Sequence, residues 1–495
     1  MRNWWIVSSI LVGSALASPA AAQHHHADGA TISEAQSPKH ESAYARGLYL
    51  LHNFEYSRAA VAFREAQSAD PGDVMAYWGE AMTYNHPLWA EQDSEAARAV
   101  LARLAPTAQA RRAKARTELQ TLWLDAVDGL YGEGSKVERD AVYHDRMERL
   151  FIAHPNDVDV RTFFALATLG LAHGGRDTAL YMKGAALLEE GFAQHPMHPG
   201  LLHYLIHAYD DPAHAPLGVR AARRYASVAP DAGHAQHMIS HIFLALGDWP
   251  EVERANVQAD KVVDGQRAAE GKSATSCGHY NEWLAYALMQ QGKDTSTIVD
   301  GCRAQAVKES DAPGDGLIGG WRSAASSWSD MALRQGTETG RWPAPVNWPE
   351  GRYLLAKFNL AYANVLRSQP TAAVAAVSAM KSLRDGIVKA IPAEMPDEES
   401  LPRWLDRAVA QGEALVMFAS DRDKGLAMLR EAAAIEATLP VEFGPPALAK
   451  PSAELLADQL LALGRKAAAA AAYRQVLAAA PGRRLAVAGL AAATR

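Results

Sequence analysis

The chain has 495 residues, of which 49 are basic and 56 acidic, and its net charge is −7. This length exceeds one ordinary hydrophobic core, but a repeat array avoids that limit because each unit packs only on its neighbours. No basic face or arm is present, which argues against a nucleic-acid partner. After the N-terminus no segment approaches twenty uninterrupted apolar residues, so we expect no membrane span.

Residues 1–22 are typical of a secretory signal peptide. One basic residue precedes an apolar stretch at 4–16, and small residues stand at Ala20 and Ala22. Cleavage near Ala22 would place the mature protein in the periplasm or outside the cell. The polar residues that follow, 23–40, are expected to be disordered.

From Ser42 onward the apolar residues recur at helical spacing, interrupted by Gly or Asp-Pro, and no alternating run indicates a sheet. Several segments fit the 34-residue helix–turn–helix of a tetratricopeptide repeat. The residues that carry this pattern are Gly47, Leu50, Ala59, Phe63, Ala66 and Pro71, then Pro196, Pro230, Gly247 and Gly292, and finally Leu460, Gly464, Ala469, Tyr473 and Pro481. We therefore predict an all-α, tetratricopeptide-like α-solenoid of antiparallel helix pairs.

The repeats are expected to cover 41–310 and 351–495. Between them, 311–350 is rich in Gly and Pro. It also contains four tryptophans, Trp321, Trp328, Trp342 and Trp348. Two interpretations stay open: an irregular packed insertion, or an aromatic flap over the groove of the solenoid, since long loops in compact proteins are often functional.

Five of the 18 histidines lie in two consecutive repeats, and four of them fall at matching places. His203 and His207 are four residues apart and share one helical face, as do His234, His237 and His241 at intervals of three and four. The separations 203–237 and 207–241 both equal the 34-residue repeat. These histidines therefore occupy equivalent places on adjacent first helices (A helices) of the repeats.

The turn glycine Gly292 sets the register of the next A helix, where His279, Glu282 and Tyr286 take the second, fifth and ninth places. Such places line the concave groove of tetratricopeptide arrays, and neighbouring helix axes lie about 8–10 Å apart, so three helices can bring side chains to one point. The predicted metal ligands are His203, His207, His234, His237, His241 and His279. Glu282 is the candidate general base, unless it is itself a ligand.

Neutral imidazole is the commonest protein ligand for transition metals, and an i,i+4 pair presents two nitrogens to one ion. Zn, Cu or Fe would accept these ligands, although the lack of Cys and Met argues against Cu(I). The number of histidines fits an open mononuclear site with further histidines behind it, or a two-metal site. Two alternatives stay open: satisfied structural histidines, or a groove in which histidines donate hydrogen bonds to an organic anion or peptide.

Other groove positions are expected to contact a small-molecule or peptide ligand. They are His52 and His86, both at the thirteenth place of an A helix, together with Trp78 and Tyr286.

The turn after the first histidine helix contains Asp210 and His214. Either they complete the site behind its ligands, or Asp-Asp-Pro simply ends the helix. His195 and His198 flank a turn proline and are expected to face solvent.

Cys277 precedes one predicted helix and Cys302 lies near the end of the next, antiparallel one. These ends meet in a helical hairpin, and an oxidising compartment favours a disulfide between them.

Three segments resemble a family of exported bacterial tetratricopeptide-repeat proteins. They are HYLIHAYDDP at 203–212, HAQHMISHIF at 234–243 and MAYWGEAM at 75–82. The resemblance covers roughly residues 42–295 and includes His52 and His279-x-x-Glu282. It implies the repeat fold and export, and supplies no reaction.

Two functions are compatible with these features. The first is a periplasmic metalloenzyme, either a hydrolase with a metal-bound water or an oxidoreductase with redox-active Cu or Fe. The second is a non-catalytic binding module, either a peptide-binding scaffold or a metal carrier. No nucleophile elbow, phosphate loop or His-Glu-x-x-His motif points to other chemistry.

Overall fold

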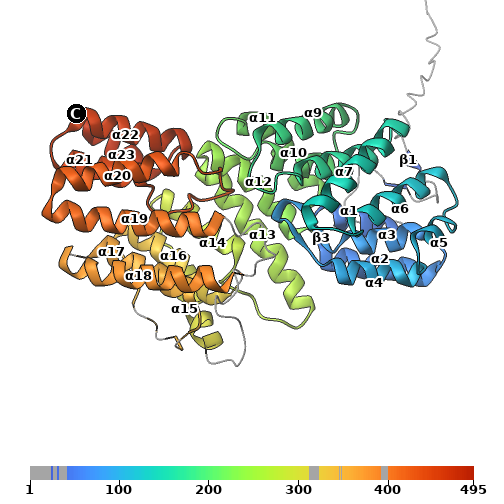
Figure 1. The fold of residues 1–495 in the computed structure, drawn as a ribbon, viewed down its shortest axis with the longest axis horizontal. Coiled ribbons are helices and arrows are strands. Elements are labelled where there is room, and N and C mark those ends of the chain that lie inside the picture. The colour runs from blue at the N-terminus through green and yellow to red at the C-terminus, as the bar shows by residue number, and fades with distance from the viewer. Residues whose placement is uncertain are drawn as a thin grey trace, which may run out of the picture.

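The computed structural model describes residues 24–25, 31–32, 42–310, 323–344, 346, 348–349, 351–368, 370–391 and 400–495. The predicted signal peptide, most of 23–40 and Trp321 lie outside these residues. In the described part nearly every element is an α-helix, and Figure 1 shows the helices stacked in antiparallel pairs along the molecule. The chain is an all-α, tetratricopeptide-like α-solenoid, as predicted.

The helices before the histidine repeats are α1 (Ala43–His52), α2 (Tyr56–Ala69), α3 (Val74–Met82), α4 (Ser94–Leu104), α5 (Ala108–Arg112), α6 (Glu118–Leu130), α7 (Lys136–Ala153), α8 (Val158–Leu169) and α9 (Thr178–Gln194). The histidine repeats contain α10 (Pro199–Ala208), α11 (Ala215–Val228), α12 (Gly233–Leu246), α13 (Trp249–Ala269), α14 (His279–Gln290) and α15 (Ser296–Ser310). The C-terminal helices are α16 (Ala324–Thr339), α17 (Leu354–Arg367), α18 (Pro370–Ala390), α19 (Ser400–Ser420), α20 (Arg422–Glu436), α21 (Ser452–Ala462), α22 (Lys466–Ala479) and α23 (Arg484–Thr494).

The remaining elements are very short. β1 (His24–His25) pairs with β2 (Thr31–Ile32), β3 (Asn85–His86) pairs with β4 (Glu91–Gln92), and the 3₁₀-helix η1 (Pro87–Trp89) lies between β3 and β4. In the described part of the chain no helix is long and apolar enough to cross a membrane.

Small residues allow the helix pairs to pack closely. A Cβ atom at Gly79 of α3 would lie 2.3 Å from the Phe63 ring of α2, so only glycine leaves room for that ring. Gly247 and Gly292 end α12 and α14 with φ of 72° and 68°, a left-handed conformation that commonly terminates a helix. These are two of the turn glycines on which the predicted register depends.

Helix α16 occupies part of 311–350, where the sequence predicts an irregular insertion. Its Trp328 side chain is buried and lies 5.8 Å, between ring centroids, from that of Trp348. Both rings belong to a core cluster that also contains Cys277 and Cys302, which are joined by a disulfide. These two tryptophans therefore stabilise the solenoid and form no flap over the histidines.

The C-terminal repeats return to contact the histidine repeats. The carbonyl of Gly482 accepts the indole N–H of Trp249 at 3.0 Å. Arg483 is fully buried, forms ion pairs with Glu338 and Glu454, and donates to the hydroxyl of Tyr286 at 3.1 Å. In Figure 1 helices α10, α12 and α14 accordingly lie in the middle of the molecule.

Candidate metal centre

The six predicted histidine ligands lie in two groups of three. The first group is His203 and His207 of α10 with His234 of α12, and the second is His237 and His241 of α12 with His279 of α14. Within each group one ring nitrogen of every member lies within 4.8 Å of the others. Each group thus combines an i,i+4 pair with a histidine from the first turn of the following A helix.

In the first group His203 is the central ring. Its Nε2 atom lies 3.2 Å from Nε2 of His207 and 3.2 Å from Nε2 of His234. Its Nδ1 atom donates to the backbone carbonyl of His52 at 2.7 Å, and a carbonyl cannot donate in return. Burial lowers the pKa of His203 to about 3, so the ring is neutral and its Nε2 lone pair faces two other ring nitrogens.

In the second group the hydrogen bonds fix two rings. His237 Nδ1 donates to the Asn256 side-chain oxygen at 2.7 Å, and the Asn256 amide nitrogen donates to a backbone carbonyl at 2.8 Å, which sets the amide orientation. His241 Nδ1 donates to the carboxylate of Asp210. The Nε2 atoms of His237 and His241 then face each other at 3.1 Å, and in the neutral form of both rings each carries a lone pair.

Two lone pairs at this distance repel unless a cation, a proton or a metal ion, lies between them. Burial, together with the neighbouring imidazoles, lowers the pKa of His207, His234 and His237 well below the usual histidine range, which disfavours protons there. A transition metal held between the ring nitrogens of a group would remove this repulsion. Ligating histidines ordinarily donate their other N–H to a carboxylate or carbonyl, as His203, His237 and His241 do.

The six histidines differ in their exposure to solvent. His203, His207, His237 and His241 are at most 5% exposed, whereas His234 is partly exposed and His279 is exposed. The groups therefore open to solvent at the first turns of α12 and α14.

Aromatic rings surround the histidines, and the sequence did not single them out as site residues. The Phe54 ring lies 4.4 Å from that of His203, and the Trp89 ring lies 6.1 Å from that of His234. Trp283 lies 4.3 Å from His241. Trp283 follows His279 by four residues on one helical face, a spacing that could have identified it.

A third group, His52, Asp159 and His198, lies behind the first. The Asp159 carboxylate contacts Nε2 of His52 at 2.8 Å and Nε2 of His198 at 3.0 Å. His52 Nδ1 lies 3.2 Å from the Tyr204 hydroxyl, and His198 Nδ1 accepts the Leu201 N–H at 3.4 Å. All four ring nitrogens have protein partners, so this group is a hydrogen-bond network that supports the carbonyl bound by His203.

This network corrects two expectations. His52 is fully buried with both ring nitrogens bonded, so its ring does not face a ligand. His198 is 1% exposed, because it caps α10 and pairs with Asp159, and it does not face solvent.

The predicted general base lies apart from the histidines. Glu282 belongs to neither group, and its neighbours Ser327, Asp330 and Arg334 belong to α16. Burial, with a contribution from Asp330, raises the pKa of Glu282 to about 7. Its position against α16 does not support the predicted role as a base beside the metal.

Two predicted ligand contacts are core residues. Tyr286 is 1% exposed and binds Arg483, and Trp78 is 1% exposed and packs 4.7 Å from the Trp123 ring. Burial by these partners leaves neither side chain available to a ligand.

The remaining predicted residues are placed as follows. Asp210 accepts a hydrogen bond from His241 and so lies behind a predicted ligand, which agrees with the interpretation that its turn completes the site. His214 bonds the carboxylate of Asp211 at 2.7 Å beside the start of α11 and belongs to neither group. His86 is partly exposed and its ring stacks on that of Tyr56 at 4.1 Å between centroids. The rings of Tyr56 and Phe54 separate it from His203 of the first group.

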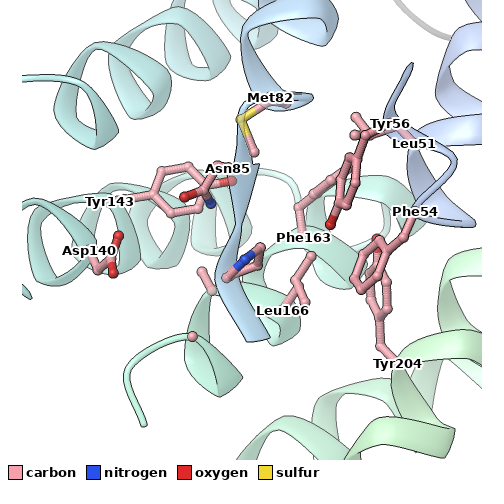
Figure 2. Close-up of a pocket in the computed structure, with 13 residues that line it drawn as sticks. Leu51, Phe54, Tyr56, Met82, Asn85, Asp140, Tyr143, Phe163, Leu166 and Tyr204 are labelled. Atoms are coloured by element: carbon pink, nitrogen blue, oxygen red, sulfur yellow. The ribbon is translucent and has the colours of Figure 1, made fainter. Parts of the chain in front are cut away.

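A small pocket lies on the far side of Phe54 from His203. Figure 2 shows Phe54, Tyr56 and Tyr204 on one side of it and Tyr143 and Asp140 on the other. Its free volume of about 20 Å³ is room for one or two water molecules, because one water needs roughly 10–15 Å³. This pocket is too small to hold a peptide.

Comparison with known proteins adds little. No family model matches the sequence, and no curated protein matches it. Among solved structures, the crystal structure of yeast Tom70 is similar with a TM-score of 0.34 and 10% identity, over 88% of this chain and 89% of that chain. A similarity with so low a TM-score carries no argument about the site.

Proposed function

We propose that the protein is an exported metalloenzyme that holds two transition-metal ions, one in each group of three histidines. The observation that carries this proposal is the pair His237 and His241, whose Nε2 atoms face each other at 3.1 Å while their Nδ1 atoms are bonded to Asn256 and Asp210. A bound metal ion would also explain why a third ring, that of His279, lies beside this pair. It would explain equally why the preceding repeat holds a matching group of three histidines.

Three protein ligands favour catalysis over metal storage. Catalytic metal sites keep a coordination position open for water or substrate, whereas structural zinc sites are closed by four protein ligands. With such an open position the metal would either activate a bound water for hydrolysis or act as a redox-active ion in an oxidation. The exposed edges of His234 and His279 give a small substrate access to it.

The alternative of a non-catalytic module has less support. A carrier has to release its metal readily, but four of the six ligands are buried. A peptide scaffold needs an open groove, but Phe54 and Trp283 lie directly against the histidine rings.

Export is supported by three features. The first residues are typical of a signal peptide. Cys277 and Cys302 form a disulfide, a bond that persists mainly outside the cytoplasm. The histidine motifs also resemble a family of exported bacterial repeat proteins.

Elemental analysis of untagged protein exported to a bacterial periplasm tests the proposal. We expect about two equivalents of transition metal in the wild type and at most about one in His237→Ala, which removes a ligand of the second group. His154→Ala is the matched control, since His154 ends α7 and belongs to neither group; it should bind as much metal as the wild type. Less than about 0.1 equivalent in the wild type, or full loading of His237→Ala, contradicts the proposal.

A further inference from the structure

We propose that the two histidine groups form one coupled dinuclear copper centre that binds a small bridging ligand, such as hydroxide or a diatomic molecule. This inference rests on the proposed function, because it requires that both groups bind metal. It adds the identity of the metal, the distance between the ions and the class of ligand.

The first argument is distance. His207 and His241 are equivalent residues of consecutive repeats, and their ring centroids are 6.0 Å apart. Rings of the two groups are thus immediate neighbours. The proposed centre places its two ions about 4 Å apart, the usual separation in two-metal sites. One small ligand can bridge ions at such a separation.

The second argument is that the two groups are in direct contact. Helix α12 supplies His234 to the first group and His237 and His241 to the second. The rings of His234 and His237 lie 6.3 Å apart, and those of His207 and His241 meet edge to face. The centre is therefore one continuous set of six imidazoles.

The third argument concerns the ligand atoms. Among the described residues, neither group includes a carboxylate or a sulfur atom. Imidazole nitrogen suits Cu, Zn, Fe and Ni, whereas hard ions such as Mg and Mn prefer oxygen. Of the divalent first-row ions, Cu binds nitrogen sites most tightly. A set of six imidazoles therefore favours copper.

The fourth argument is charge. The Asp210 carboxylate accepts a hydrogen bond from the His241 ring, whereas the partners of His203 and His237 are neutral oxygens. The buried Arg176 cation donates to the carbonyl of His207 at 3.2 Å and is paired with Asp211. A buried positive charge without compensation is costly, so two Cu(I) ions are accommodated more easily than two divalent ions. This outweighs the argument against Cu(I) from the missing sulfur ligands.

The fifth argument concerns the size of the ligand. The Phe443 ring lies 6.4 Å from that of His207, and a Cβ atom at Gly444 would lie 2.5 Å from the Trp283 ring. The segment between α20 and α21 thus packs against His207 of the first group and against Trp283, which lies beside His241 of the second. Together with Phe54 and Trp89 it crowds the histidines with aromatic rings, which favours a bridging ligand of one or two heavy atoms.

Copper titration with a spin count tests the inference on the full mature chain. Apo-protein is reconstituted with Cu(II), bound copper is measured by elemental analysis, and unpaired spins are counted by electron paramagnetic resonance. A bridging hydroxide pairs the two Cu(II) spins antiparallel. We therefore expect about two bound ions per chain, with less than about one fifth of the copper visible. His207→Ala and His241→Ala should each bind one ion, and that ion should be fully visible.

The wild-type spin count decides the question even if a variant fails to fold. Two bound ions with two full spins mean separate mononuclear sites, which overturns this inference and leaves the proposed function intact. Zinc that a tenfold excess of Cu(II) does not displace overturns the assignment of copper. No bound metal overturns both proposals.

Discussion

Asn256 of α13 shows how one side chain fixes the chemistry of a histidine. Its oxygen accepts from His237 Nδ1 at 2.7 Å, and its nitrogen is bonded to a backbone carbonyl, so the amide cannot turn. The His237 ring is thereby held in the tautomer whose Nε2 lone pair points at His241. Partners of this kind orient metal ligands and raise their basicity.

Asn256→Leu should weaken the second site selectively. Without an acceptor, His237 can move its proton to Nε2, and we expect metal affinity there to fall about 10–100-fold. Competition titration with a chromogenic chelator measures this change. Asn256→Asp keeps the acceptor oxygen and should stay within a few-fold of the wild type. Wild-type affinity in the leucine variant would contradict the account.

Glu282 gives a prediction for pH dependence. Burial raises its pKa from 4.5 to about 7 in the folded chain, so between these values the folded state holds a proton that the unfolded state has released. The stability that the folded chain gains by keeping Glu282 protonated is thus fully present below pH 4.5 and decreases as the pH rises toward 7. Relative to Glu282→Gln, the wild type should lose about 1–3 kcal/mol of unfolding free energy over this range. Chemical denaturation at several pH values checks it; parallel profiles for the two proteins would refute it.

The clustering of the six histidines was predictable because a 34-residue period is visible in the chain itself. Glu282 and Tyr286 share the predicted groove places with His279, but a register does not say which of these places another part of the chain covers. In the structure α16 covers the face of α14 that carries Glu282, and Arg483 covers Tyr286. These neighbours come from distant parts of the chain, and local periodicity carries no information about them.

At the scale of elements, α14 depends on the disulfide beside it. Cys277 lies two residues before His279, and its bond to Cys302 ties the start of α14 to α15. Closing the loop between cysteines 25 residues apart stabilises the folded chain by about 3 kcal/mol.

The double variant Cys277→Ser, Cys302→Ser should therefore affect the two groups unequally. We expect a lower melting temperature and loss of metal from the second group, which needs His279, while the first group stays loaded. Elemental analysis before and after mild dialysis measures this difference. Equal retention by both groups, or equal loss, would show that the disulfide does not position His279.

The paired helices were predictable because apolar residues at helical spacing and turn glycines such as Gly292 are local signals. Helix α16 was missed since its neighbourhood is rich in Gly, Pro and Trp, a composition typical of loops. What holds it is burial of Trp328 against Trp348 and the disulfide cluster, a tertiary effect.

At the scale of the whole molecule, Arg483 joins the C-terminal repeats to the histidine repeats. It is completely buried between Glu338 and Glu454 and bonds Tyr286 of α14. This junction is close to the segment that carries Phe443 over the first histidine group.

Arg483→Met should open this junction, because it removes the buried cation between two buried carboxylates and leaves them only the longer contacts of Glu338 with Arg484 and of Glu454 with Lys450. Such a change costs about 3–5 kcal/mol. Hydrogen exchange followed by mass spectrometry should show faster exchange in α14 and around Phe443 than in the wild type. Arg465→Ala is the control, since Arg465 forms an exposed pair with Asp423 and should have little effect. Unchanged exchange in Arg483→Met would exclude this role.

The most direct test of the two metal sites is anomalous X-ray diffraction from crystals of metal-loaded protein, recorded on both sides of the absorption edge. We predict two anomalous peaks. One should lie about 2.0 Å from the Nε2 atoms of His203, His207 and His234. The other should lie equally close to the Nε2 atoms of His237 and His241 and to one ring nitrogen of His279. No peak at either position, or a peak at His52, Asp159 and His198 instead, would contradict the account.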